Sequence, residues 1–320
     1  MIASYSIRLA ILCLASFFLI HLVIGLLSLG LFPRIARAAA SMRPQQASRV
    51  LILLRLGPAF LSLVLVLTAC LPSYLRYEEN HASEEIGLLC LMPACLGFLV
   101  CLTAFVRAMR AIIQSSSLSC TVRAAKDLTS WHLASEAGEL PSFGLVGLLK
   151  PRVVVSPRVL NALTPEQFQA ALEHERAHRS SGDNLKRLLI LLAPDLIPFL
   201  RSFRVLEDQW DQYAELAADD FATRGNPDRS IALAEALIRL ARLDGNQAQP
   251  PLVSGLFAAR EGLAVRVERL LRFDPVAEPH KRFPTFFWLT PSLFLVGSVL
   301  VFPQFQVFHG LYRLLESLLR

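Results

Sequence analysis

The chain has 320 residues, of which 54% are hydrophobic and only 18% are charged. Together with a mean hydropathy of +0.47, this composition excludes an ordinary soluble globule and favours a chain with lipid-facing helices. The formal net charge of +6 is not concentrated in a basic block, so we expect no nucleic-acid partner. Five of the six cysteines lie in apolar runs, which indicates reduced thiols and no disulfides.

Four apolar runs are long enough to cross a bilayer, because a helix needs about 20 apolar residues to span the hydrocarbon core. They cover residues 9–32, 50–71, 86–106 and 283–302. The first run is too long for the apolar region of a signal peptide, and we interpret it as a retained anchor. Arg55 interrupts the second run near its start. We expect its long side chain to snorkel to the membrane surface.

The charges of the loops predict how the chain is oriented. The linker after the first run carries four arginines and no acid, whereas the linker after the second carries four glutamates and one arginine. Arg107 and Arg110 follow the third run, and Lys281 and Arg282 precede the fourth. By the positive-inside rule these basic flanks face the cytoplasm. The sequence thus predicts a multi-pass protein of the inner (cytoplasmic) cell membrane with three parts: three transmembrane helices (1–110), a cytosolic domain (111–282), and a fourth helix with a short outer tail (283–320).

The first part of the cytosolic domain shows strand signals. Residues 120–125 and 130–135 have β-leaning compositions. Val153, Val154 and Val155 form a β-branched run between Pro151 and Pro157, and this pattern suits an edge strand. We expect such an edge to bind an extended substrate by main-chain pairing.

Helical signals dominate the rest of the domain. Thr164 and Gln167 form a capping-box pattern around Pro165, which predicts a helix that ends near Ser181 before Gly182. Further helices are predicted from about residue 183, over 205–224 and 228–243, and around 263–271. The very apolar stretch 188–200 contains two prolines, and we interpret it as a helix pair lying on the membrane or over the site.

One motif in this domain predicts a metal-dependent catalytic site. His174 and His178 lie one turn apart in the capped helix, so both imidazoles project from one face and can hold one Zn²⁺. Glu175 stands beside the first histidine, where it can take a proton from a water molecule that the metal polarises. Such a five-residue motif also arises by chance, but its place inside a capped helix favours the zinc site.

A catalytic zinc needs a third protein ligand, and a later helix offers Glu215. Asp219 follows four residues later on the same face and can accept the free N–H of a zinc-bound histidine. Asp183 either caps the next helix or orients a histidine in the same way. The alternative is a solvated acidic face, because Asp211 and Asp220 lie nearby.

These segments resemble a known family. Residues 141–185 and the stretch YAELAADDFA at 213–222 are similar to the zinc metallopeptidases of the BlaR/MecR type, the beta-lactam-sensing antirepressors. The resemblance implies Glu215 as the third zinc ligand and Asp219 as its partner. HtpX-like and CAAX-prenyl endopeptidases share these motifs. Because no room follows the last span for the extracellular sensor domain of the BlaR/MecR proteins, we expect this chain to lack it.

The sequence therefore predicts an α-helical membrane protein with about four transmembrane helices and a mostly helical α+β zincin domain of the gluzincin type. The expected function is a zinc metalloendopeptidase with one zinc per chain, acting on a cytosolic or membrane-proximal protein. The resemblance adds signal transduction, with self-cleavage or a repressor as substrate. Two alternatives stay open: a catalytically silent membrane scaffold that keeps the fold, and a transporter-like protein with a chance motif.

Overall fold

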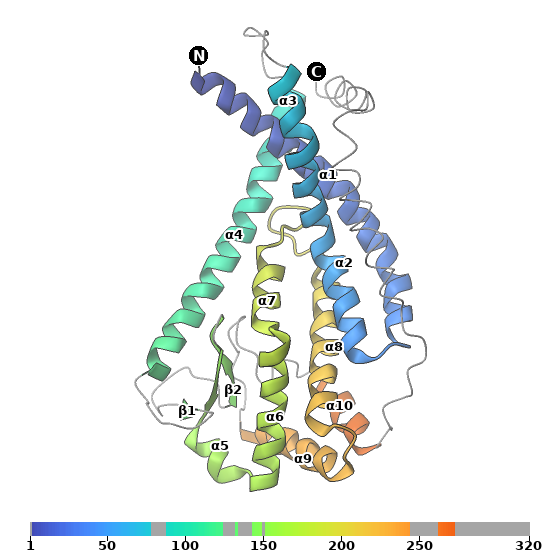
Figure 1. Ribbon diagram of the computed structural model, residues 1–320, viewed down its shortest axis with the longest axis vertical. Helices are drawn as coiled ribbons and strands as arrows, with labels where there is room; N and C mark the ends of the chain where they lie inside the picture. The colour runs from blue at the N-terminus through green and yellow to red at the C-terminus, as the bar shows by residue number, and fades with distance from the viewer. Residues whose placement is uncertain are drawn as a thin grey trace.

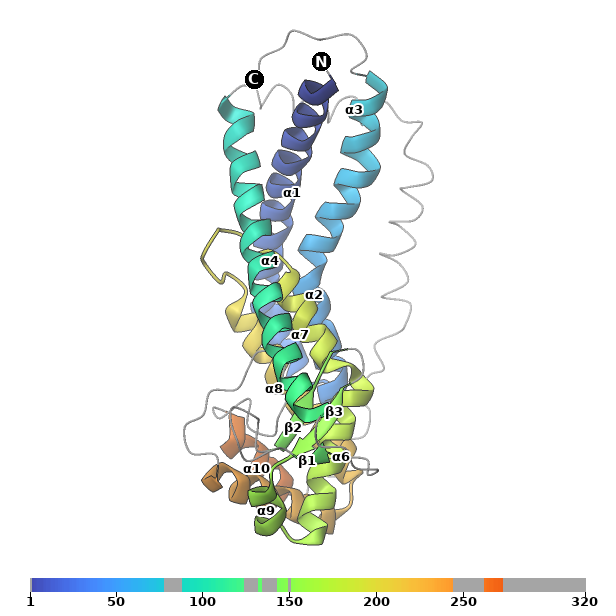
Figure 2. The same cartoon turned by 90° about the vertical axis from the view of Figure 1, so that its left-hand side faces the viewer.

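The computed structural model (Figure 1) describes residues 2–77, 88–123, 132–133, 143–148, 151–243 and 262–272. The fourth predicted span and the tail after it lie outside the described residues. Long helices form one end of the molecule, and a smaller mixed domain lies at the other end (Figure 2).

Three long apolar helices correspond to the first three predicted spans. Helix α1 covers Ile2–Ala39, and α2 (Pro44–Leu65) continues through a π-helical turn, η1 (Val66–Cys70), into α3 (Leu71–Tyr77). Helix α4 covers Leu88–Arg123. By length and composition, 6–39, 44–75 and 90–116 can each cross a membrane. Leu27, Phe60 and Phe98 are more than half exposed on these helices, which suits contact with lipid.

A three-stranded sheet opens the second domain. Its strands are β1 (His132–Leu133), β2 (Phe143–Val146) and β3 (Arg152–Val155), in the order β1-β3-β2. Strand β3 pairs in parallel with β1 and antiparallel with β2. The sheet thus confirms strands within 130–135 and at 152–155. The strand predicted at 120–125 is wrong for residues 120–123, which form the last turn of α4.

The prediction that Val153, Val154 and Val155 form an edge strand is wrong. They lie in the central strand of the sheet and are at most 2% exposed. An unbroken β-branched run is typical of a strand that is buried on both faces. The two prolines that suggested an edge stand outside the strand, so they remove none of its ladder hydrogen bonds.

The helices of this domain follow their sequence signals closely. They are α5 (Pro157–Ala162), α6 (Pro165–Ser181), α7 (Asp183–Leu192), α8 (Arg204–Thr223), α9 (Pro227–Leu243) and α10 (Leu263–Leu271). The predicted capping box at the start of α6 is confirmed, with reciprocal bonds between Thr164 and Gln167. Gly182 ends α6 with a φ of 68°, a left-handed conformation that suits glycine.

Apolar side chains between the sheet and helices α6, α9 and α10 form the core of the domain. Phe143, Val155, Leu172, Leu233 and Leu237 are all buried there. This packing fixes α6 against the sheet. On its other side α6 packs against α8, and α8 also runs beside α2 (Figure 1). Helix α8 therefore contacts both the small domain and the long apolar helices.

The apolar stretch 188–200 does not form the predicted helix pair. Helix α7 ends at Leu192, and residues 193–203 are irregular except for a bridge between Ile197 and Leu200. Pro194 and Pro198 explain the difference, because each lacks the N–H that a helix requires and disfavours the helical conformation of the residue before it.

Candidate metal centre

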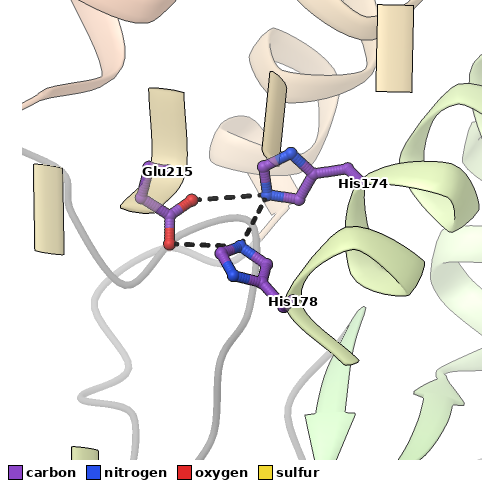
Figure 3. Close-up of side chains that lie close together, drawn as sticks. All are labelled: His174, His178 and Glu215. Atoms are coloured by element: carbon purple, nitrogen blue, oxygen red, sulfur yellow. Dashed lines mark hydrogen bonds and ion pairs between the residues drawn. The ribbon is translucent and has the colours of Figure 1, made fainter. Parts of the chain in front are cut away.

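Two histidines from α6 and one glutamate from α8 meet in the interior of the small domain (Figure 3). The Nε2 atoms of His174 and His178 are 3.1 Å apart. Glu215 Oε2 lies 3.3 Å from His174 Nε2, and Glu215 Oε1 lies 3.5 Å from His178 Nε2. All three side chains are fully buried. Their nitrogen and oxygen atoms converge on one point, as the i,i+4 spacing of the histidines predicts.

The donor set fits a zinc ion. Zinc is bound by imidazole nitrogen and carboxylate oxygen at about 2.0–2.1 Å, usually with tetrahedral geometry. Tetrahedral ligands at that radius are about 3.3 Å from one another. The three separations here, 3.1, 3.3 and 3.5 Å, bracket that value. Among the described residues, these three form the group of side chains that could hold a metal ion.

A carboxylate lies next to the Nδ1 atom of each histidine. His178 Nδ1 is hydrogen-bonded to Asp183 Oδ2 at 2.7 Å, and His174 Nδ1 lies 3.0 Å from Asp219 Oδ1. Burial raises the pKa of Asp183, but His178 and Lys186 outweigh it and hold that pKa below its ordinary value. An ionised carboxylate at Nδ1 keeps the proton there and leaves the Nε2 lone pair free to face a metal.

Glu175 lies next to this group and has a different environment. It is fully buried, and neither of its carboxylate oxygens has a hydrogen-bond partner among the described residues. Burial raises the pKa of Glu175 to about 7, against the opposing influence of His178 and His174. A carboxylate with a pKa near neutrality can both accept and return a proton, as a general base and acid must.

Two arginines complete the site, and neither was predicted from the sequence. Arg266 of α10 binds Asp219 through two nitrogens at 2.7 and 2.8 Å and reaches Glu215 at 2.9 Å. Arg187 of α7 pairs with Asp211 at 2.5 Å and lies 3.6 Å from Glu215. Burial raises the pKa of Asp219, but Arg266 and His174 together lower it to about 2.

A sequence signal for Arg266 was present. It falls in the apolar stripe of α10 with Leu263, Val267 and Leu270, where a charged residue is unexpected unless it has a buried partner. Arg187 has no comparable local signal.

The burial of Glu215 and Asp219 rules out the solvated acidic face. They are 0% and 1% exposed, and the two neighbouring acids also have partners, Arg187 for Asp211 and Arg269 for Asp220. The structure thus gathers His174, Glu175, His178, Glu215, Asp183 and Asp219 in one site. Val153 and Val155 of β3 belong to the core cluster instead, and Val154 is also buried.

Apolar helices that can cross a membrane, joined to a small domain with a buried His-His-Glu group that could hold a metal ion, are the arrangement expected of a membrane metallopeptidase. The comparison with protein families agrees, since residues 77–270 match the model of the BlaR1 peptidase M56 family. That match covers more than half of the chain, so the protein belongs to this family, whose members are metallopeptidases. No curated protein and no solved structure matches the chain.

Proposed function

We propose that the chain is a zinc-dependent endopeptidase with a gluzincin-like domain, hydrolysing peptide bonds of a cytosolic or membrane-proximal protein. The observation that carries this proposal is the convergence of His174, His178 and Glu215 beside the buried carboxylate of Glu175. Membership of the M56 family supports it independently.

The proposed roles follow from the environment of each side chain. His174, His178 and Glu215 would hold the zinc ion, while Asp219 and Asp183 would fix the two imidazoles by their Nδ1 atoms. When bound, zinc would polarise the scissile carbonyl and lower the pKa of water. Glu175 would accept the proton of the attacking water and return it to the leaving amine.

We also infer the place of the reaction. The basic flanks of the apolar helices favour a cytosolic peptidase domain in the inner membrane. Residues 283–302, outside the described part, are proposed as a fourth span because their composition and length fit one. A signalling role, with self-cleavage or cleavage of a repressor, follows from the family and is proposed on that ground alone.

The substitution Glu175→Gln tests the mechanism, because it keeps the shape of the side chain and removes its basicity. We expect cleavage of casein, or self-cleavage, by the purified zinc-loaded protein to fall about 10²- to 10⁴-fold, the usual contribution of a general acid–base group. The zinc content should stay unchanged.

Glu173→Gln is the matched control. Glu173 lies two residues away on the same helix but pairs outward with Arg176 and Arg224. Its variant should cleave like the parent. Equal cleavage by the Glu175→Gln protein and the parent would reject the mechanism, and no cleavage by any form would favour a silent scaffold.

A further inference from the structure

The irregular connection between α7 and α8, residues 193–203, lies among the apolar helices. In Figures 1 and 2 it stands level with the middle of α2 and α4. Leu196 packs against Gly25 of α1 so closely that a Cβ at Gly25 would be 2.2 Å from the Leu196 Cδ2 atom. Arg55 of α2 and Arg107 of α4 also bind this connection. All three contact residues belong to segments that can cross a membrane.

The positions of two contacts along their helices give the depth of the connection. Gly25 lies seven residues inside the end of the first apolar run at Phe32, and Arg55 lies six residues beyond Arg49. At 1.5 Å per residue, both are about 10 Å inside the apolar part of their helices. Because α1 and α2 follow one another in the chain through a short link at their lower ends, the two depths refer to the same side of the membrane.

The surface of this region is apolar where a water-exposed loop would be polar. Phe199 is 86% exposed at the tip of the turn between Ile197 and Leu200, which are themselves 53% and 56% exposed. Leu185, Leu189 and Leu192 add an exposed apolar stripe on α7 at i, i+4 and i+7. A contiguous patch of large apolar side chains marks a surface that contacts lipid or protein.

Most charged groups that bind this connection are turned inward, whereas Arg201 is 47% exposed and pairs with Glu207. Arg55 is 0% exposed and donates to the carbonyl oxygens of Ile190 at 3.2 Å, Ala193 at 2.9 Å and Pro194 at 3.4 Å. Its Nε donates to Glu207 at 2.8 Å. Hydrocarbon contains no water to satisfy backbone groups, so an irregular segment at membrane depth needs protein partners of this kind.

The acids of the region are neutralised in the same way. Asp195 forms an ion pair with Arg107 and lies 3.8 Å from Arg55. Glu207 is shared between Arg55 and Arg201. The expectation that Arg55 snorkels to the surface is therefore wrong, because its side chain points into the protein and the connection supplies its partners.

We propose that the α7–α8 connection is embedded in the bilayer, with Phe199 and its apolar neighbours against lipid acyl chains and Arg55 satisfying the polar groups behind them. The peptidase domain is then partly embedded in the membrane through this connection, in addition to being linked covalently to the transmembrane helices. The occupant is lipid because the patch lies at the depth of the apolar runs and on a segment whose charges are already paired. This placement rests on contacts alone and holds whatever reaction the metal site performs.

Tryptophan fluorescence of the Phe199→Trp variant tests the proposal. The full chain would be reconstituted into phosphatidylcholine vesicles with either plain or brominated acyl chains. Because the chain has three native tryptophans, the signal is the difference from the parent protein. We expect brominated lipid to quench most of the added emission and iodide in the buffer to leave it unchanged.

Arg229→Trp is the matched control, since Arg229 is an exposed residue of α9 at the opposite end of the small domain (Figure 1). Its added emission should be quenched by iodide and not by brominated lipid. Quenching of the Phe199→Trp signal by iodide would place the connection in water. Quenching by neither agent would show that protein covers it, through a second copy or another segment. Either result overturns the proposal.

Discussion

Two largely buried clusters of charged and polar side chains lie about two turns apart along α8, and they are built differently. In the metal cluster, His174, His178 and Glu215 point their donor atoms at one another at 3.1–3.5 Å. In the arginine cluster, formed by Arg55, Arg107, Arg201, Asp195 and Glu207, each carboxylate meets a guanidinium. Converging donor atoms suit the binding of a cation, whereas carboxylates already paired with guanidinium groups need no bound ion. We infer that the first cluster performs chemistry and the second holds the domain in place.

The largest expected effect is the loss of stability on Arg55→Met. The change takes from Glu207 one of its two arginines and removes a donor from the backbone carbonyls of Ile190, Ala193 and Pro194, of which that of Ala193 keeps Arg107 as a second donor. Breaking a buried ion pair from one side costs about 3–5 kcal/mol. Unfolding in detergent micelles, followed by circular dichroism against denaturant, should show a decrease of that size in the free energy of unfolding.

Two comparisons sharpen this result. Arg201→Met removes the other arginine that pairs with Glu207. Because the Arg201 side chain is 47% exposed, this change should lower the free energy of unfolding by no more than about 1 kcal/mol. The double variant Arg55→Met, Glu207→Met should recover part of the loss, because it removes the buried carboxylate and the charge that loses its partner, Arg201, is 47% exposed to solvent. If Arg55→Met lowered the free energy of unfolding as little as Arg201→Met, the arginine cluster would not hold the domain in place.

An intermediate effect is expected for Asp183→Asn in the metal cluster. The amide oxygen can still accept from His178 Nδ1, which lies 2.7 Å from Asp183 Oδ2 in the parent, but it lacks the negative charge that holds the proton there. Loss of such an outer carboxylate typically weakens metal binding about 10- to 100-fold. Zinc titration against a competing chelator measures the change. Asp208→Asn, at a 62% exposed position of α8, should leave zinc affinity unaltered, and an equal loss in both variants would contradict the assigned role.

The two clusters also differ in how far the sequence predicted them. The metal cluster follows local rules: i,i+4 spacing on α6 and again on α8 places the ligands and Asp219, and Gly182 turns the chain so that Asp183 returns to His178. Apart from Arg201 and Glu207, the pairs of the arginine cluster join residues more than 80 positions apart, and no local pattern records such pairs. For this reason the sequence indicated a snorkelling side chain for Arg55 and gave no sign of its buried partners.

The sheet illustrates the same limit. Strand β3 was predicted from its β-branched residues, but its place in the middle of the sheet depends on β1 and β2, which lie elsewhere in the chain. The helices α6 to α10 were predicted closely because caps, prolines and glycines mark their ends locally.

The smallest expected effect concerns the cap of the helix that carries both histidines. Thr164→Ala removes the hydroxyl that accepts from the Gln167 backbone N–H and should lower the free energy of unfolding by about 1 kcal/mol. Zinc affinity should not change, since the cap lies more than two turns from His174. Thr164→Ser keeps the hydroxyl and should behave like the parent. A loss of zinc in Thr164→Ala would mean that the site depends on the helix end.

The metal content of the purified full chain tests the central claim most directly, with X-ray absorption at the zinc edge to define the ligands. We predict one zinc per chain, with nitrogen and oxygen neighbours at about 2.0–2.1 Å, and loss of that zinc in Glu215→Ala. A parent protein with no stoichiometric zinc, or a Glu215→Ala protein that keeps its zinc with unchanged ligands, would contradict it.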